Sequence, residues 1–226
     1  MPAAKRPGPR APTAPASPDE LVPVEPDALE RGEGAEWHGL LIAGDLTGID
    51  GAEVEIVGCR FVDARLTGAV LSDAVVRDTV FERCELSGVQ LFGAHLQRVE
   101  VRDCRASGLD LGGAKLLDVR VVDTRADDAN LALVAAERVV FDGCDLRGAD
   151  AHDLRMVDGA FLDCNLRDVE LSHARLAGTR LHGSQLEGLR GAKDLVGVVI
   201  GPDQQVALGL ALLASLEVVV ADEEEP

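Results

Sequence analysis

Apolar residues recur at every fifth position along most of this 226-residue chain. From residue 41 to residue 186, thirty successive positions at this spacing hold 29 hydrophobic residues and one glycine, although only 46% of the chain is hydrophobic. An α-helix repeats every 3.6 residues and an ordinary half-buried strand every two. A strict period of five therefore excludes both as the main element of the fold.

A second apolar position lies two residues before each of these. It holds small or apolar side chains such as Ala64, Ala69 and Cys84, and neither position carries a charge between residues 39 and 186. Residues two apart in an extended segment point to the same side, so both face inward. Such units cannot form a hairpin sheet, because the inward direction would reverse at each bend. They predict a continuous coil in which each unit buries its apolar side by stacking on its neighbours.

A slower period of twenty residues gives the number of sides. Three sets of residues follow it: Phe61, Phe81, Phe141 and Phe161; Cys84, Cys104, Cys144 and Cys164; Gly48, Gly68, Gly88, Gly108, Gly148 and Gly188. Four pentads thus make one turn, with Phe on Phe inside and Gly at a corner, where a tight bend favours a residue without Cβ. At roughly 4.8 Å per turn, the result is an all-β solenoid about 36 Å long with a filled interior.

The chain divides into three regions by composition. Residues 1–36 are rich in Pro, Ala and charge and bury too little apolar surface to offset the entropy of ordering, so we expect a disordered tail. Residues 37–200 form the coil. Residues 201–226 predict a short α-helix followed by the acidic run ADEEEP.

The expected C-terminal helix is apolar on two faces. Pro202 and Asp203 suit its first turn. The two faces consist of Val206, Leu210 and Leu213, and of Leu208, Leu212 and Leu216. One face can cap the open coil while the other meets a second copy of the chain; the alternative is a cap alone.

Acidic residues outnumber basic ones by 40 to 22, a formal net charge of −18. This excess disfavours nucleic acid and anionic membranes as direct ligands and favours a basic partner. Half of the excess lies outside the coil, because residues 37–200 hold 27 acidic and 18 basic residues.

The sequence offers no catalytic or metal-binding arrangement. Its five cysteines, an odd number without a CxxC pair, fall at small inward positions and predict buried structural thiols. The histidines pair with no nucleophile, and no phosphate-binding loop occurs. No stretch resembles a signal peptide or a membrane span. We therefore expect a cytoplasmic protein that is not an enzyme and has no cofactor or metal.

Two columns of charged residues run along the predicted coil. One alternates in sign, as stacked salt bridges would: Asp78, Arg98, Asp118, Arg138 and Asp158. The other is mostly acidic and is the candidate partner-binding line, with carboxylates in place of phosphates: Asp63, Asp103, Asp123 and Asp163. The alternative for any such column is a solvated surface.

The units resemble those of the pentapeptide-repeat family, which read Ala-(Asp/Asn)-Leu-X-X. Units such as CDLRG, CNLRD, ARLTG and AKLLD keep the small-X-apolar pattern, and the resemblance runs from residue 39 to about residue 190. It implies a right-handed, four-sided β-helix.

The resemblance also implies a function. A branch of the family, including the mycobacterial quinolone-resistance protein and the plasmid-borne Qnr proteins, binds DNA gyrase or topoisomerase IV as a mimic of duplex DNA. Family members also pair through their C-terminal ends, which favours a homodimer here. Qnr proteins project loops between coils, and the unbroken period from 41 to 186 has none, which leaves the loop-free mycobacterial type. The alternative is a scaffold rod that binds an unrelated protein.

Overall fold

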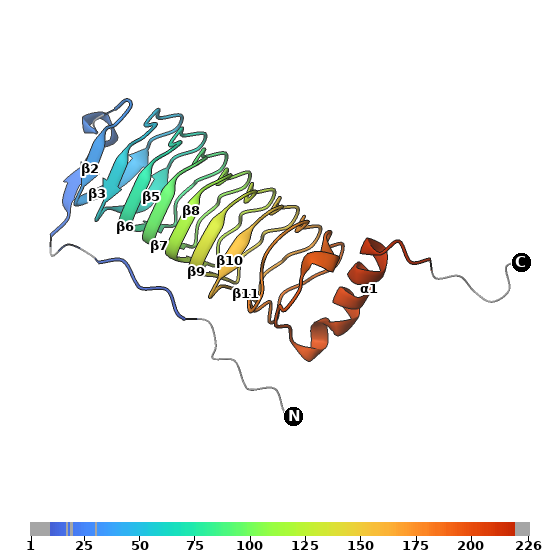
Figure 1. The fold of residues 1–226 in the computed structure, drawn as a ribbon. Coiled ribbons are helices and arrows are strands. Elements are labelled where there is room, and N and C mark those ends of the chain that lie inside the picture. Colours follow the sequence, from blue (N-terminus) through green and yellow to red (C-terminus); the bar gives the residue numbers. More distant parts are fainter. Residues whose placement is uncertain (1–9, 17, 19, 30, 220–226) are drawn as a thin grey trace, which may run out of the picture.

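The chain forms a rod of stacked coils in a computed structural model, which describes residues 10–16, 18, 20–29 and 31–219 (Figure 1). The rod is a parallel β-solenoid of about seven turns, ended by one short α-helix. The right-handed, four-sided β-helix expected from the sequence is confirmed. No helix in the described part of the chain is long and apolar enough to cross a membrane.

Parallel strands build two sides of the coil. In chain order they are β1 (Val22–Val24), β2 (Glu36–His38), β3 (Leu40–Asp45), β4 (Glu55–Val57), β5 (Arg60–Arg65), β6 (Val75–Glu82), β7 (His95–Arg102), β8 (Lys115–Val122), β9 (Ala135–Asp142), β10 (Arg155–Val157) and β11 (Ala160–Leu162). Strands β6 to β9 pair in steps of twenty residues, as in Val76 to Leu96 to Leu116. The other two sides carry single bridges at the same step, such as Asp110 to Asn130.

The inward register predicted from the period of five holds from Leu46 to Leu186. Every predicted centre in that range is buried except Leu91, Val101 and Val121, which are partly exposed. The predicted phenylalanine stack also forms. The ring centroids of Phe61 and Phe81 lie 4.6 Å apart, and those of Phe141 and Phe161 lie 5.1 Å apart. Stacking of like side chains on successive turns thus fills most of the interior.

The first turn departs from this register. Trp37 pairs with Ile56 and Ile42 with Phe61, a step of 19 residues, and a bulge between Ile42 and Gly44 restores the step of twenty. The prediction that Leu41 points inward is therefore wrong. The shorter turn places the larger Trp37 and Ile42 inside, where both are fully buried.

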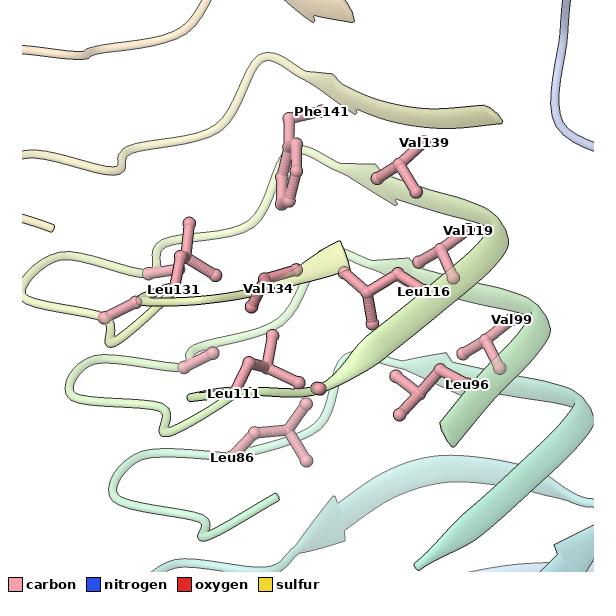
Figure 2. Packing of buried hydrophobic residues seen from close by; sticks show 14 of the residues in the cluster. Leu86, Leu96, Val99, Leu111, Leu116, Val119, Leu131, Val134, Val139 and Phe141 are labelled. Carbon is pink, nitrogen blue, oxygen red and sulfur yellow. The ribbon is translucent and has the colours of Figure 1, made fainter. Parts of the chain in front are cut away.

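The middle of the coil is not completely filled. A cavity of about 70 Å³ lies where Val101 and Val121 interrupt the phenylalanine column and Ala106 and Ala126 interrupt a leucine column. Figure 2 shows side chains that line this space and point into the coil: Leu86, Leu96, Leu111, Leu116, Leu131 and Phe141. Small side chains in two adjacent columns of the same turns leave room that their neighbours do not fill. The expectation of a filled interior is wrong at this point.

The C-terminal end is closed by two 3-10 turns, η2 (Ala192–Asp194) and η3 (Pro202–Gln204), and by helix α1 (Gln205–Ser215) (Figure 1). Gln204 is buried beneath the helix. Its amide nitrogen donates to the carbonyls of Leu181 and Ser184 at 2.5 and 2.6 Å, and its oxygen accepts from the Gly201 N–H at 2.8 Å. This one side chain satisfies carbonyl groups that the last turn leaves without a strand above them.

The coil begins earlier than the sequence predicts. Part of the expected disordered tail forms β1, which pairs with β3, and the 3-10 turn η1 (Pro26–Ala28). Further upstream, residues 13 and 16 hydrogen-bond to the side of the coil. These backbone N–H groups find acceptors on the folded body, which composition alone does not reveal. Residues 1–9 and the acidic run at 221–226 lie outside the described residues.

Candidate functional site

The corners of the coil select aspartate for a reason that has nothing to do with a partner. The residue two places after an inward centre has a positive φ, and 11 of the 18 non-glycine residues with positive φ are aspartates. Aspartate enters this left-handed region more easily than most residues because its short polar side chain bonds locally. An aspartate at a corner is therefore first a feature of the backbone.

The predicted binding line lies on one such corner, which we call the acidic corner. Its members are all exposed and all have positive φ: Asp63, Asp103, Asp123 and Asp163. Asp63 is neutralised by Arg83, whose Nε and Nη2 donate to its two carboxylate oxygens at 2.9 and 3.1 Å. This contact also lowers the pKa of Asp63. The four predicted residues therefore lie in one line, but one of them, Asp63, forms an ion pair with Arg83.

Corner aspartates also lean over glycines of the next turn. A Cβ built on Gly143 would lie 2.5 Å from Oδ1 of Asp123, and one on Gly183 would collide with the carboxylate of Asp163. Both glycines have positive φ themselves. The alternation of aspartate and glycine on this corner therefore follows from backbone conformation and from the space that each carboxylate occupies.

A second acidic surface was missed by sequence reasoning. It covers one of the two sides built from single bridges, together with the corner that follows, and we call it the acidic face. Its carboxylates are Asp50, Glu53, Asp73, Asp110, Asp150, Asp153 and Glu170. No lysine or arginine interrupts the outward columns of this side between residues 50 and 173. The signal is hard to see in sequence because the carboxylates are spread over two columns.

Most carboxylates of the acidic face lack a counter-charge. Glu170 pairs with Arg190 at 3.3 Å and Asp150 with His152 at 2.7 Å. The other five form no ion pair with a described lysine or arginine. Asp110 instead accepts from the Asn130 amide at 2.8 Å and from the Gly112 N–H at 2.9 Å. These contacts orient the carboxylate and leave its negative charge in place.

The strand-bearing sides differ, because arginines neutralise their carboxylates across turns. Glu82 accepts from Arg60 at 2.6 Å and from Arg102 at 2.9 Å, and these contacts lower its pKa to about 2. Asp78 pairs with Arg98 and Asp118 with Arg138, each through two hydrogen bonds. The alternating column therefore forms two separate pairs. These partly buried pairs cancel charge on the strand-bearing sides.

The cysteines are structural, as predicted. All five are buried and free, and their thiols lie near backbone carbonyls, as with Cys59 Sγ and the Trp37 carbonyl at 3.1 Å. Burial raises the pKa of the Cys59 thiol, which keeps it protonated. Within the described ranges, no group of three or more His, Cys, Asp or Glu side chains is arranged to hold a metal ion.

Helix α1 presents one apolar face to the coil and one to solvent. Leu208 and Leu212 pack against the core. Val206, Leu210 and Leu213 are exposed by 74%, 64% and 38%. Leu216, which the sequence groups with Leu208 and Leu212, lies just beyond the helix and is 62% exposed.

The family model for pentapeptide repeats matches eight copies, over residues 59–98 and 161–190. No curated protein sequence matches the chain. Among solved structures, a trypsin-treated form of QnrB1, a plasmid-mediated fluoroquinolone resistance protein, is 21% identical and aligns with 84% of this chain and 100% of its own, with a TM-score of 0.45.

HetL, a pentapeptide repeat protein involved in heterocyst differentiation regulation in the cyanobacterium Nostoc sp., is 16% identical; the alignment covers 76% of this chain and 88% of HetL, with a TM-score of 0.42. The matched repeats fall on the turns whose inward register the structure displays. The chain therefore contains pentapeptide repeats at residues 59–98 and 161–190.

Proposed function

We propose that the chain is a non-enzymatic, cytoplasmic protein that binds DNA gyrase or another type II topoisomerase in place of DNA and thereby protects the enzyme from inhibitors or tunes its activity. The observation that carries this proposal is the acidic face, where carboxylates without a counter-charge line one side of a rigid rod. Such a surface complements a basic groove that normally receives phosphates. The acidic corner is the alternative contact line.

The dimensions suit this role, although the charge is sparser than on DNA. Six turns separate Asp50 from Glu170, roughly 29 Å at about 4.8 Å per turn. Five carboxylates without an ion pair over that length give about one charge per 6 Å, whereas duplex DNA carries about one per 1.7 Å. We therefore expect binding that is weaker than that of DNA and that falls steeply as salt rises.

A supercoiling assay with purified gyrase tests this proposal. The protein is added at several concentrations, with and without a fluoroquinolone, at low and at physiological salt. We expect inhibition of supercoiling or protection from the drug at low salt, weakening as salt rises. No binding and no change in activity at low salt would reject the topoisomerase as partner. Binding to another basic protein under the same conditions would then support the scaffold alternative.

The same proposal includes a homodimer formed through α1. Val206 and Leu210 expose apolar side chains on the outer face of the helix, where a second copy can bury them. We expect light scattering after size exclusion to give twice the chain mass at micromolar concentration. Val206→Glu/Leu210→Glu should give a monomer, while Gln205→Glu on the same helix should not. A wild-type monomer at that concentration would overturn the dimer.

A further inference from the structure

An N-terminal strap lies along one corner of the coil. We define it as residues 10–16 and 18; it runs back from β1 toward the C-terminal end of the rod (Figure 1). The backbone N–H of Thr13 donates to Oδ1 of Asp118 at 2.9 Å, and that of Ala16 donates to Oδ1 of Asp78 at 3.0 Å. Nearer β1, the ring of Pro18 lies against Gly58, with Cδ 3.5 Å from the position of a Cβ.

All of these contacts fall on a single column of the coil, which we call the strap corner. Its members lie twenty residues apart, at the point where the long strands bend: Gly58, Asp78, Arg98, Asp118, Arg138 and Asp158. The corner acceptors for the strap are two turns apart, because an arginine occupies every turn between aspartates. Two turns amount to roughly 9.6 Å.

The strap has a matching period. Prolines recur at every third residue, at Pro12, Pro15 and Pro18, which favours a polyproline II helix with three residues per turn and about 3.1 Å per residue. One turn of it therefore advances about 9.3 Å. Thr13 and Ala16 are one such turn apart, so their N–H groups point the same way and meet carboxylates at nearly the same spacing.

The acceptors are held by arginines of the coil as well as by the strap. Arg98 holds Asp78 through two hydrogen bonds of 2.6 Å, and Arg138 holds Asp118 through bonds of 2.7 and 3.0 Å. Asp118 is only 6% exposed, so it is a costly place for a polar group without partners. The strap prolines bring no N–H groups of their own, which leaves two donor registers: that of Arg10, Thr13 and Ala16, which holds both observed donors, and that of Ala11 and Ala14.

A groove lies between the strap and the coil beside this corner. It has a volume of about 380 Å³, and its walls include Pro15 and Pro18 from the strap and Arg60, Val80 and Arg102 from the coil. The groove lies on the strand-bearing sides, whereas the acidic face lies on the opposite side of the coil. Occupation of the strap corner therefore does not cover the acidic face.

We propose that the strap corner is a binding site for an extended, proline-rich chain that offers a backbone N–H at every third residue, and that the strap of the same chain is its resident ligand. The match between one polyproline II turn and two coil turns is what the site recognises. The same spacing predicts that the N–H of Arg10 lies opposite Asp158, two turns beyond Asp118. A tethered ligand acts at an effective concentration on the order of millimolar, so an external peptide competes poorly.

Hydrogen exchange of the full chain, resolved by NMR at Thr13 and Ala16, tests the site. Asp78→Gly/Asp118→Gly removes both acceptors and keeps the corner conformation, since glycine occupies this column at Gly58. Asp63→Gly is the matched control: it also removes the aspartate partner of an arginine one turn away, but the described strap does not contact it. We expect protection of at least ~10-fold in the wild type and in the control, and none in the double variant.

Two results of the exchange experiment would overturn the site. One is absence of protection at both amides in the wild type, and the other is equal protection in the double variant. Protection that rises with protein concentration would assign the ligand to the strap of a second copy and would overturn the assignment within one chain.

A peptide experiment tests the specificity of the same site. Thr13→Pro/Ala16→Pro in the full chain removes the two donors but keeps the extended conformation. A fluorescent peptide with the sequence of residues 7–24 should bind this variant at least ~10-fold more tightly than the wild type. The same peptide with proline at the two donor positions should not bind. Equal binding of both peptides, or no binding of the native peptide to the variant, contradicts recognition by N–H groups at every third residue.

Discussion

The acidic corner and the acidic face carry the same kind of side chain for different reasons. At the corner, positive φ selects aspartate or glycine, and Arg83 neutralises Asp63. On the face, Glu53, Asp73 and Asp153 share this positive φ, but Asp50 and Asp110 sit in a bridged column that also holds valine, glutamine and asparagine, as Val70 shows. A carboxylate is informative about a partner only where the backbone does not already require it and no arginine cancels it.

Neutralising each surface separately gives the largest expected difference between them. We compare Asp50→Asn/Asp73→Asn/Asp110→Asn/Asp153→Asn on the face with asparagine at positions 63, 103, 123 and 163 on the corner. Both variants remove four charges, and asparagine tolerates positive φ. At somewhat under 1 kcal/mol per exposed pair, the face variant should lose roughly 100-fold in gyrase affinity. The corner variant should lose less than about 3-fold.

Calorimetric titration at low salt measures both affinities, and circular dichroism confirms that both variants fold. A corner variant that loses as much affinity as the face variant, or more, would reverse the assignment of the contact surface.

Valine substitutions separate the structural roles of the two regions. Asp123→Val places a β-branched residue at a φ of 46°, which should cost about 1–3 kcal/mol in the free energy of unfolding. Asp110→Val should cost less than about 1 kcal/mol, because valine already occupies this column at position 70. Urea denaturation measures both. Equal losses would mean that corner conformation does not select aspartate.

Glycine-to-alanine substitutions test whether corner carboxylates contact the glycines of the next turn. Gly108 and Gly183 have φ of 64° and 70°, but only a Cβ on Gly183 meets a carboxylate, that of Asp163. Gly108→Ala should cost about 1 kcal/mol through strain alone. Gly183→Ala should cost more, by roughly 0.5 kcal/mol, because Asp163 must move. Thermal unfolding compares them, and the reverse order would contradict the proposed contact.

The smallest effect concerns pH. His152 lies on the acidic face, and its hydrogen bond with Asp150 raises its pKa. As pH falls through that pKa, the imidazole gains a charge and the acidic face becomes less negative, so affinity for a basic partner should fall by about 2- to 3-fold.

The hydrogen bond between His152 and Asp150 stabilises the folded chain most at low pH, where affinity for a basic partner is lowest. Because the folded pKa is raised, the contribution of His152 is complete below the unfolded pKa and is lost as pH rises through the folded pKa. His152→Asn should remove the dependence of affinity on pH in this range. A dependence that persists in that variant would assign it to another group.

The fold was predictable because the period of five identifies each inward position in the sequence. The 19-residue first turn was not, since Leu40, Leu41 and Ile42 are all apolar and any of them can point inward. The cavity has a sequence signal that becomes clear only in three dimensions: Val101 and Ala106 are small in the same turn.

The surfaces were harder to predict. The acidic corner is visible as one column, but its pairing with Arg83 depends on side-chain geometry one turn away. The strap looked disordered because composition describes its apolar content and not its acceptors, which lie 62 and 105 residues further along the chain. The cap residue Gln204 has no signal beyond its place before a helix, since its partners belong to the last turn.

Competition between this protein and duplex DNA for gyrase tests most directly whether the acidic face replaces DNA. Fluorescently labelled linear duplex is bound to gyrase at low salt, and unlabelled protein is added while anisotropy is recorded. We predict complete displacement of the duplex by the wild type and displacement weakened by roughly 100-fold for the variant with four asparagines on the acidic face. Formation of a ternary complex, in which the protein binds while the duplex stays bound, would contradict DNA mimicry.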